Sequence, residues 1–114
     1  MSYIGVEVAI IKIKNVMAEW KEFNPDADKS IKDDFMENPS PNCKKLITYL
    51  NNGEIKLAAP EREIDVISGD EIGKTHCILT DGEYSWSSSL AYYVEKYNLS
   101  LPKEFEEKII SAKG

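Results

Sequence analysis

The chain has 114 residues, of which 42% are hydrophobic and 30% charged, and its 20 acidic and 14 basic side chains give a net charge of −6. This length accommodates one hydrophobic core, and the composition is that of a folded protein rather than a disordered one. The acidic balance argues against proteins that bind nucleic acids or anionic membrane surfaces, because both need a basic face. A basic protein partner fits the charge, since complementary charge speeds association.

The N-terminal stretch contains two apolar patterns, one after the other. The first alternates with a period of two, which predicts a short strand. From Ile13 the apolar residues follow at spacings of three and four, which predicts an amphipathic helix that ends near Pro25. The alternating residues are Ile4, Val6 and Val8, and those of the helix are Ile13, Val16, Met17, Trp20 and Phe23.

No segment has the pattern of a membrane span or a secretion signal. The longest apolar-leaning run, residues 4–13, contains two charged residues and is too short to cross a bilayer. We therefore expect a cytoplasmic protein. In that compartment Cys43 and Cys77 are expected to be reduced, although a bridge between them would depend on how closely they approach in space.

Residues 26–41 form a polar, proline-punctuated segment. Asp28 or Ser30 is suited to cap a helical turn that carries Ile31, Phe35 and Met36. We interpret the segment as a mobile insertion. It contains one of two acidic sets in the chain: Asp26, Asp28, Asp33, Asp34 and Glu37.

The middle of the chain predicts a helix followed by two strands. Asn42 is a suitable N-cap for a helix over residues 43–52, and Gly53 follows it at the position of a helix-terminating glycine. Residues 54–59 alternate and predict a strand that Pro60 ends. A further strand is expected around Ile64, Val66 and Ile67, before a turn at Ser68, Gly69 and Asp70.

The last third predicts a hairpin and two helices. Residues 74–80 and 83–86 are strand-like and meet across Asp81-Gly82, a typical pair for a two-residue hairpin turn. Ser87 or Ser88 is expected to cap a helix that Asn98 ends, and Pro102 opens the last helix, with Phe105, Ile109 and Ile110 inward. The sum is a single α+β domain: a mostly antiparallel sheet of about four or five strands with helices, two of them C-terminal.

The catalytic candidates are few. His76 and Cys77 are neighbours on a strand and point to opposite faces, so they cannot form a nucleophile–base pair with each other. His76 would need Cys43 or a serine brought to it by the fold. The three serines at 87–89 lack the glycines of a nucleophile elbow.

No metal or cofactor site is predicted. One histidine and two separated cysteines lack the spacing of zinc ligands. The carboxylates of Asp65, Asp70 and Glu71 do not fit the calcium-loop spacing, and the glycines do not form a phosphate-binding loop.

The remaining candidates are acidic and aromatic side chains that could bind a partner protein. Acidic runs are usually solvated, but two of them in loops also make a docking surface for a basic protein. Aromatic residues serve equally as core residues and as interface anchors. The predicted partner-binding residues are Asp33, Asp34, Glu61, Glu63, Asp65, Asp70, Glu71, Tyr84, Trp86 and Tyr92.

The chain from Leu46 onward resembles a known group of small bacterial proteins. The residues that carry the resemblance are LITYLNNGEIKLAAPEREIDVISGDEIG and TDGEYSWSSSLAYYVEKYNLSLPKEF. They resemble the immunity proteins that are paired with polymorphic or contact-dependent growth inhibition toxins. The resemblance implies a protein without catalytic activity or cofactor, which binds one cognate toxin domain, often a nuclease, and blocks its active site.

Two alternatives stay open beside this hypothesis. One is a structural or scaffold subunit that forms a homodimer through an exposed sheet edge, although the leading hypothesis also allows a monomer or a weak homodimer. The other is a small enzyme that uses His76 or Cys77.

Overall fold

The computed structural model describes residues 12–112, except for the side chains of Lys74 and Thr75, and shows an α+β fold. Its four-stranded sheet has the order β1-β4-β3-β2, with β1 parallel to β4 and the other pairs antiparallel. The predicted fold class and both C-terminal helices are confirmed. The elements are β1 (Lys14–Asn15), η1 (Val16–Glu19), η2 (Ile31–Asp34), α1 (Cys43–Asn51), β2 (Glu54–Ile64), β3 (Glu71–Thr80), β4 (Tyr84–Ser87), α2 (Leu90–Tyr97) and α3 (Lys103–Ser111), where η denotes a 3-10 helix.

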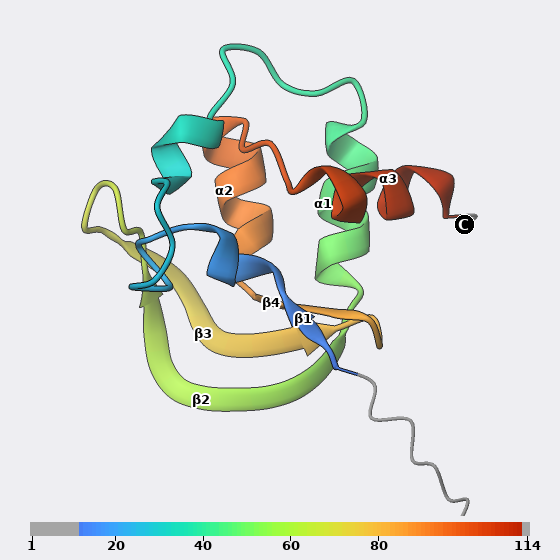
Figure 1. Cartoon of the computed structure of the whole chain (residues 1–114). Coiled ribbons are helices and arrows are strands. Elements are labelled where there is room, and N and C mark those ends of the chain that lie inside the picture. Colours follow the sequence, from blue (N-terminus) through green and yellow to red (C-terminus); the bar gives the residue numbers. More distant parts are fainter. Residues whose placement is uncertain (1–11, 113–114) are drawn as a thin grey trace, which may run out of the picture.

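The helices lie on one side of the sheet, with α1 and α2 side by side and α3 crossing in front of α1 (Figure 1). Trp86 on β4 is buried beneath them, with its ring centroid 5.3 Å from that of Phe105 on α3. Its indole Nε1 donates a hydrogen bond of 3.0 Å to the carbonyl of Leu50, the last turn of α1. One tryptophan therefore joins the sheet, the first helix and the last helix.

Gly53 connects α1 to β2 and packs against Trp86. A Cβ at this position would lie 2.6 Å from Cζ2 of Trp86, a distance that real Cβ atoms essentially never show. The predicted helix and its following glycine are confirmed, but the structural need for glycine is this close approach to the indole ring.

The predicted helix from Ile13 to Phe23 is wrong. Lys14 and Asn15 pair with β4, the short η1 follows, and Trp20 has an extended backbone. Asn15 caps η1 by accepting a hydrogen bond from the amide of Met17. The apolar spacing arises because the tight turn places Val16 and Met17, and the extended backbone places Trp20, in one core, and tertiary packing overrides helix propensity. The alternating residues Ile4, Val6 and Val8 lie outside the described residues.

The segment 26–41, interpreted as an insertion, packs against the domain. Ser30 caps η2 as predicted, and Ile31 at the start of η2 is completely buried. The ring of Phe35 stacks on Tyr97 of α2 at a centroid distance of 4.6 Å, and the backbone of Phe35 bridges to Leu99. Because its apolar residues belong to the core, this segment is part of the fold.

β2 is a single strand that continues through Pro60, so the prediction of two shorter strands is wrong. A proline is tolerated here because β2 is the edge strand of the described sheet, and no strand within residues 12–112 pairs with its outer side. The register to β3 shifts between Ala58 and Arg62, and the β2–β3 ribbon bends strongly (Figure 1). Val66 and Ile67 lie in the following turn, which the bend brings beside α2.

The β3–β4 hairpin is confirmed, with a loop of three residues, Asp81 to Glu83, rather than two. Gly82 has φ +98°, which favours glycine, and the carboxylate of Asp81 accepts hydrogen bonds from the amides of Glu83 and Tyr84. The helix-end prediction is confirmed at Asn98, which adopts the left-handed conformation.

The residues that begin the last two helices differ in part from expectation. Ser89, rather than Ser87 or Ser88, precedes α2, and its side chain makes no capping hydrogen bond. Pro102 precedes α3 as predicted, and Phe105 and Ile109 are buried. Ile110 is 38% exposed, so it does not face inward as expected.

Candidate functional site

The fold brings His76 of β3 together with Glu63 of β2 and with Ser87, the last residue of β4. Oε1 of Glu63 lies 2.5 Å from Nδ1 of His76 and accepts a hydrogen bond of 2.6 Å from the hydroxyl of Ser87. A second interaction joins the hydroxyls of Ser87 and Ser89 at 2.8 Å. Ser87 and Ser89 are buried, and the side chain of Glu63 is only 12% exposed.

This cluster contains the residue types of a serine–histidine–acid triad in a different arrangement. In a triad the imidazole lies between the hydroxyl and the carboxylate, so that it can take the hydroxyl proton. Here the carboxylate of Glu63 lies between His76 and Ser87. The hydroxyl of Ser87 donates to the acid and not to a base, and its burial keeps it from a substrate. The arrangement fixes the bent ribbon to the end of β4 rather than activating a nucleophile.

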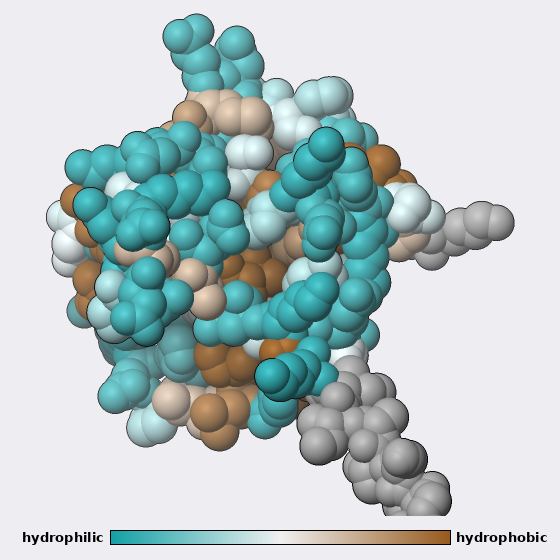
Figure 2. Space-filling model, in the orientation of Figure 1, coloured by the Kyte–Doolittle hydropathy of each residue, from teal (hydrophilic) through white to brown (hydrophobic). Residues whose placement is uncertain are grey.

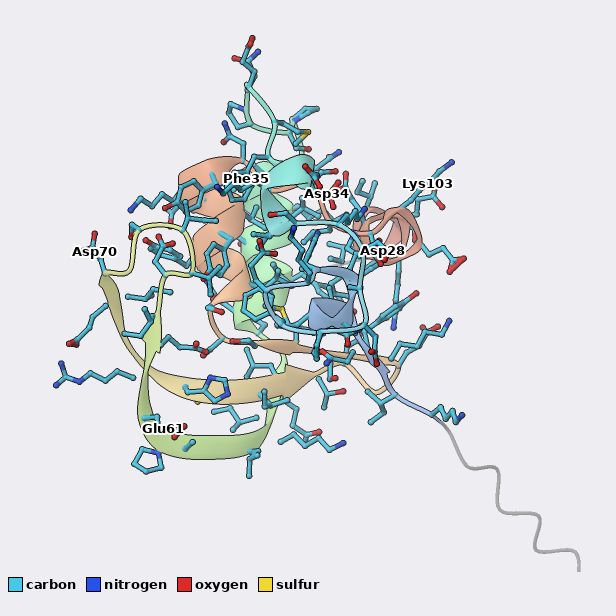
Figure 3. The ribbon with its side chains drawn as sticks, turned by 60° about the vertical axis from the view of Figure 1, so that its left-hand side comes forward. Asp28, Asp34, Phe35, Glu61, Asp70 and Lys103 are labelled. Atoms are coloured by element: carbon cyan, nitrogen blue, oxygen red, sulfur yellow. The ribbon has the colours of Figure 1, made fainter. Side chains whose placement is uncertain are left out.

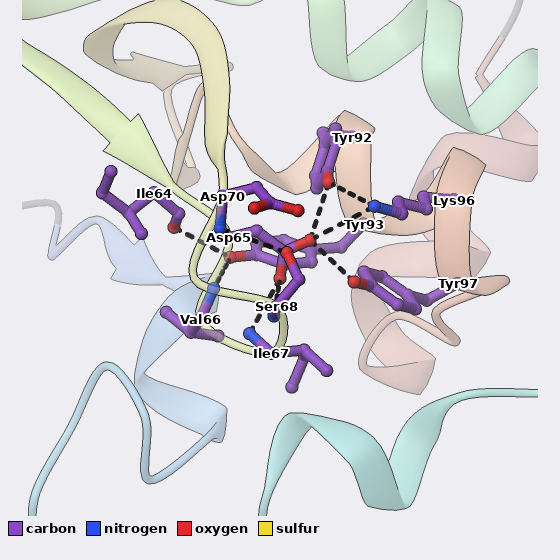
Figure 4. A network of polar contacts seen from close by, with 10 residues as sticks. All are labelled: Ile64, Asp65, Val66, Ile67, Ser68, Asp70, Tyr92, Tyr93, Lys96 and Tyr97. Carbon is purple, nitrogen blue, oxygen red and sulfur yellow. Dashed lines mark hydrogen bonds and ion pairs between the residues drawn. The ribbon is translucent and has the colours of Figure 1, made fainter.

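Asp65 is the centre of a second polar cluster, in the turn between β2 and β3 (Figure 4). Its buried carboxylate accepts hydrogen bonds of 2.6 and 2.7 Å from the hydroxyls of Tyr92 and Tyr97, both on α2. It also accepts bonds from the amides of Ile67 and Ser68. Burial opposes ionisation, but these four donors outweigh it and hold the pKa of Asp65 well below its ordinary value.

Tyr93 adds a third tyrosine contact to the same turn. Its hydroxyl accepts a hydrogen bond of 3.0 Å from the amide of Val66 and donates one of 3.4 Å to the carbonyl of Ile64. Burial raises the pKa of Tyr93 to about 12, so the hydroxyl keeps its proton at neutral pH. The three tyrosines of α2 therefore serve to hold the far end of the β2–β3 ribbon.

A third polar cluster surrounds Asp81 in the β3–β4 loop. Its carboxylate accepts a hydrogen bond of 2.6 Å from Tyr49 on α1 and forms an ion pair of 3.0 Å with Lys108 on α3. Burial works against ionisation, yet these donors and the loop amides lower the pKa of Asp81 to about 2. Burial and this carboxylate raise the pKa of Tyr49 to about 12. This cluster joins two helices to the hairpin.

Several of the predicted partner-binding residues lie inside the protein. Trp86 is 1% exposed, Tyr84 is 8% exposed and Asp65 is completely buried. Tyr92 is half-buried, and its hydroxyl is used by Asp65. A partner cannot reach these three side chains, so the prediction is wrong for them. Tyr84 and Trp86 are buried because β4 lies inside the sheet under the helices, and Asp65 is buried because its turn packs against α2.

Apart from the buried Asp65 and the largely buried Glu63, the acidic candidates are on the surface but do not form one patch. In Figure 3, Asp34 lies near the helices, Glu61 on the outer side of the ribbon and Asp70 at its far end. The carboxylate of Asp34 accepts a hydrogen bond of 2.7 Å from the indole of Trp20 and pairs with Lys29. Asp33 caps η2 through the amide of Ser30, and Glu71 pairs with Arg62. The acids of η2 therefore have local structural partners.

The outer surface of β2 was not predicted and is the most unusual feature of the molecule. No residue of this 11-residue strand is buried. Ile55 and Leu57 are 62% and 60% exposed, and Ile64 and Val66 beyond them are 45% and 40% exposed. Figure 2 shows hydrophobic surface at the lower edge, where β2 runs, bordered by hydrophilic side chains. The alternation of Ile55 and Leu57 predicted the strand but not the exposure of these two side chains.

A cavity of about 720 Å³ lies along α1, on the side near the end of α3. Its polar groups already have internal partners: Lys45 donates a hydrogen bond of 2.7 Å to the carbonyl of Ile110, and the hydroxyl of Tyr49 is bound to Asp81. Nothing in its lining selects a ligand. The lining residues are Pro41, Asn42, Lys44, Lys45, Thr48, Tyr49, Asn52 and Ala112.

Residues 12–112 offer no assembled metal site, since no three side chains of His, Cys, Asp or Glu come together to hold an ion. Cys43 and Cys77 are free thiols, and no helix in this part of the chain is long and apolar enough to cross a membrane. Comparison with known proteins found no similarity: no family model, no curated protein and no solved structure matches the chain.

Proposed function

We propose that this chain is an immunity protein, which binds a cognate bacterial toxin domain and blocks its active site without catalysing a reaction. The expected partner is a basic protein domain such as a nuclease, because the chain carries a net charge of −6. The resemblance to immunity proteins, carried by residues between Leu46 and Phe105, suggests this role, and the surface of β2 supports a protein-binding function.

The observation that carries the proposal is the exposure of β2. Isolated apolar residues are common on protein surfaces, but Ile55 and Leu57 lie close together at one sheet edge, one on each face, at 62% and 60% exposure. Glu54 and Glu61 are exposed on the same strand. An apolar centre with a polar, charged rim is the usual composition of a protein–protein interface.

The internal use of the polar clusters also favours binding over catalysis. Glu63, Asp65 and Asp81 each accept several hydrogen bonds that join secondary-structure elements. The one cavity described above lacks the set of convergent free polar groups that a substrate site needs.

The proposal is tested by co-expression with the toxin-like C-terminal domain encoded directly upstream of this chain's gene. We expect the two proteins to co-purify as a complex, and the chain to protect cells that otherwise stop growing when that domain is expressed. A domain that is toxic but neither bound nor neutralised by this chain would exclude it as the cognate partner and overturn the proposal.

A homodimeric scaffold protein is the second candidate, and the free edge of β2 favours it. An unpaired edge strand can pair with the same strand of a second copy. Sedimentation velocity over a hundredfold range of concentration distinguishes the two functions. A scaffold is expected to dimerise tightly by itself, whereas the immunity protein needs its toxin to cover β2.

A further inference from the structure

We infer that the toxin domain binds by adding an extended segment to the free edge of β2 at Glu54–Ala59, so that the sheet continues from this chain into its partner. The inference rests on the proposed function and specifies the surface and the kind of contact. It predicts a partner segment with two neighbouring apolar residues and basic residues on both sides of them.

The edge has the hydrogen-bonding groups that such a contact needs. Among residues 12–112, β2 ends the sheet order and has β3 as its only strand partner. Within residues 12–112, no backbone hydrogen bond joins Glu54–Ala59 to any segment outside the sheet. The amides and carbonyls of a strand point alternately to its two sides, so those on the outer side are directed away from β3 and can pair with an added strand.

The apolar side chains of this edge lie on both faces of the sheet. Ile55 is opposite Leu79, and Leu57 is opposite Ile78 across a register shift. Cross-strand partners share a face, and the adjacent residues Ile78 and Leu79 point to opposite faces. An added strand would therefore meet Ile55 on one face and Leu57 on the other, which requires apolar residues at two neighbouring positions of the partner.

The edge suitable for pairing ends at Pro60. Proline has no amide hydrogen to donate, and the register shift between Ala58 and Arg62 accompanies the bend of the ribbon. Beyond the bend, Arg62 is held by an ion pair of 2.8 Å with Glu71. Prolines, bends and charged side chains usually protect a sheet edge from pairing with another strand. On β2 they leave the short stretch Glu54–Ala59 open to pairing.

The charged side chains at the two ends of Glu54–Ala59 determine which charges are expected at the two ends of the partner segment. Glu54 is exposed at its beginning and Glu61 just after its end, and Figure 3 shows Glu61 on the outer side of the ribbon, away from the helices. Basic residues on the partner segment would face these carboxylates. Lys56 lies between these two carboxylates, at the stretch where the partner segment is expected to be apolar. The alkyl chain of Lys56 can pack against that segment.

The test compares two exposed aliphatic residues in a binding assay with the upstream-encoded toxin domain, used in a catalytically inactive form. Leu57→Lys changes the proposed edge, and Ile110→Lys makes the same substitution on α3, where Ile110 is 38% exposed. Both variants change the net charge by the same amount, so the effect of long-range electrostatics on binding is the same in the two and cancels when they are compared. We expect Leu57→Lys to weaken binding about 30-fold or more, as for an interface hot spot, and Ile110→Lys to weaken it less than about 3-fold.

Amide hydrogen exchange of the same complex distinguishes strand addition from a contact through side chains alone. We expect new protection at the outward amides of Glu54–Ala59 when the toxin domain is bound. Normal binding by Leu57→Lys, or protection confined to another surface, overturns the edge contact and leaves the proposed function intact. A wild-type chain that neither binds nor protects against the domain overturns both. A wild-type homodimer that Leu57→Lys dissociates identifies a second copy as the occupant instead.

Discussion

The β2–β3 hairpin differs greatly between its two ends. At the turn, the buried carboxylate of Asp65 and three tyrosines of α2 hold the chain by hydrogen bonds. At the open end, Ile55 and Leu57 are the most exposed large apolar side chains among the described residues. Because the turn and the start of β2 are both attached to the core, the exposed stretch between them belongs to a well-supported strand. A supported strand with exposed apolar residues is suited to binding, since little order is lost when a partner adds to it.

The largest expected effect comes from breaking the held end with Asp65→Ala. This variant leaves the hydroxyls of Tyr92 and Tyr97 and two turn amides without their acceptor. We expect the free energy of unfolding in urea to fall by about 3 kcal/mol, since each buried unsatisfied group costs about 1–3 kcal/mol. Asp70→Ala, at the exposed end of the same turn, is the matched control and should change it by less than about 0.5 kcal/mol. Equal effects of the two variants would contradict the role of Asp65.

The next effect concerns the attachment of β2 to the core. Gly53→Ala places a Cβ where Trp86 already lies, 2.6 Å away, so the indole or the strand has to move. We expect a loss of about 2 kcal/mol in unfolding free energy, in the range of overpacked cores. Asn52→Ala, at the exposed neighbouring position, provides the control. A Gly53→Ala variant as stable as wild type would show that this contact does not position β2.

A smaller effect is expected from acid, because the pKa of Asp81 is about 2 in the folded protein, compared with the ordinary aspartate pKa of 3.8. Because the pKa of Asp81 is lower in the folded than in the unfolded state, its ionised carboxylate stabilises the fold at every pH above the unfolded-state pKa. This stabilisation is lost as pH falls from about 4 to about 2. The contribution of Asp81 is about 2 kcal/mol, and Asp65 acts in the same direction. Urea unfolding between pH 6 and pH 2 measures the loss. Asp81→Asn should be less stable at neutral pH and should flatten the profile, and an unchanged slope would contradict the assignment.

The smallest effect on stability is expected at the exposed end. Leu57→Ala removes a side chain that is 60% exposed, and we expect the unfolding free energy to change by less than about 0.5 kcal/mol. Leu50→Ala, the same substitution at a position that is 1% exposed, should cost about 2–5 kcal/mol. A large loss for Leu57→Ala would show that this residue supports the fold, and would remove the contrast between the two ends of the hairpin.

Much of the fold could be predicted from local signals in the sequence. The left-handed end at Asn98, the helix after Pro102 and the hairpin around Gly82 follow from residues that act on their immediate neighbours. The helix after Asn42 is also confirmed, although the side chain of Asn42 makes no capping hydrogen bond. The N-terminal segment could not be predicted in this way. The apolar spacing from Ile13 fits a helix, but it also fits the observed short strand followed by a tight turn beside one core. Only the packing of Trp20 against the domain distinguishes the helix from the observed structure.

The candidate surface was predicted only in part. Glu61 and Asp70 were expected on the surface and are exposed there. Ile55 and Leu57 were missed because alternating apolar residues in a strand usually face the core. No sequence rule states that this strand lies at the edge of the sheet, where the helices do not cover it.

The sequence by itself therefore determined the α+β class, the acidic charge and the C-terminal elements, because caps, turns and proline act over a few residues. The tertiary structure decided which apolar residues are buried and which remain exposed. Trp86 and Leu57 are both apolar strand residues. Trp86 is 1% exposed beneath the helices, whereas Leu57 is 60% exposed at the sheet edge. Burial depends on which surfaces meet when distant segments pack, and that arrangement is set by the whole chain.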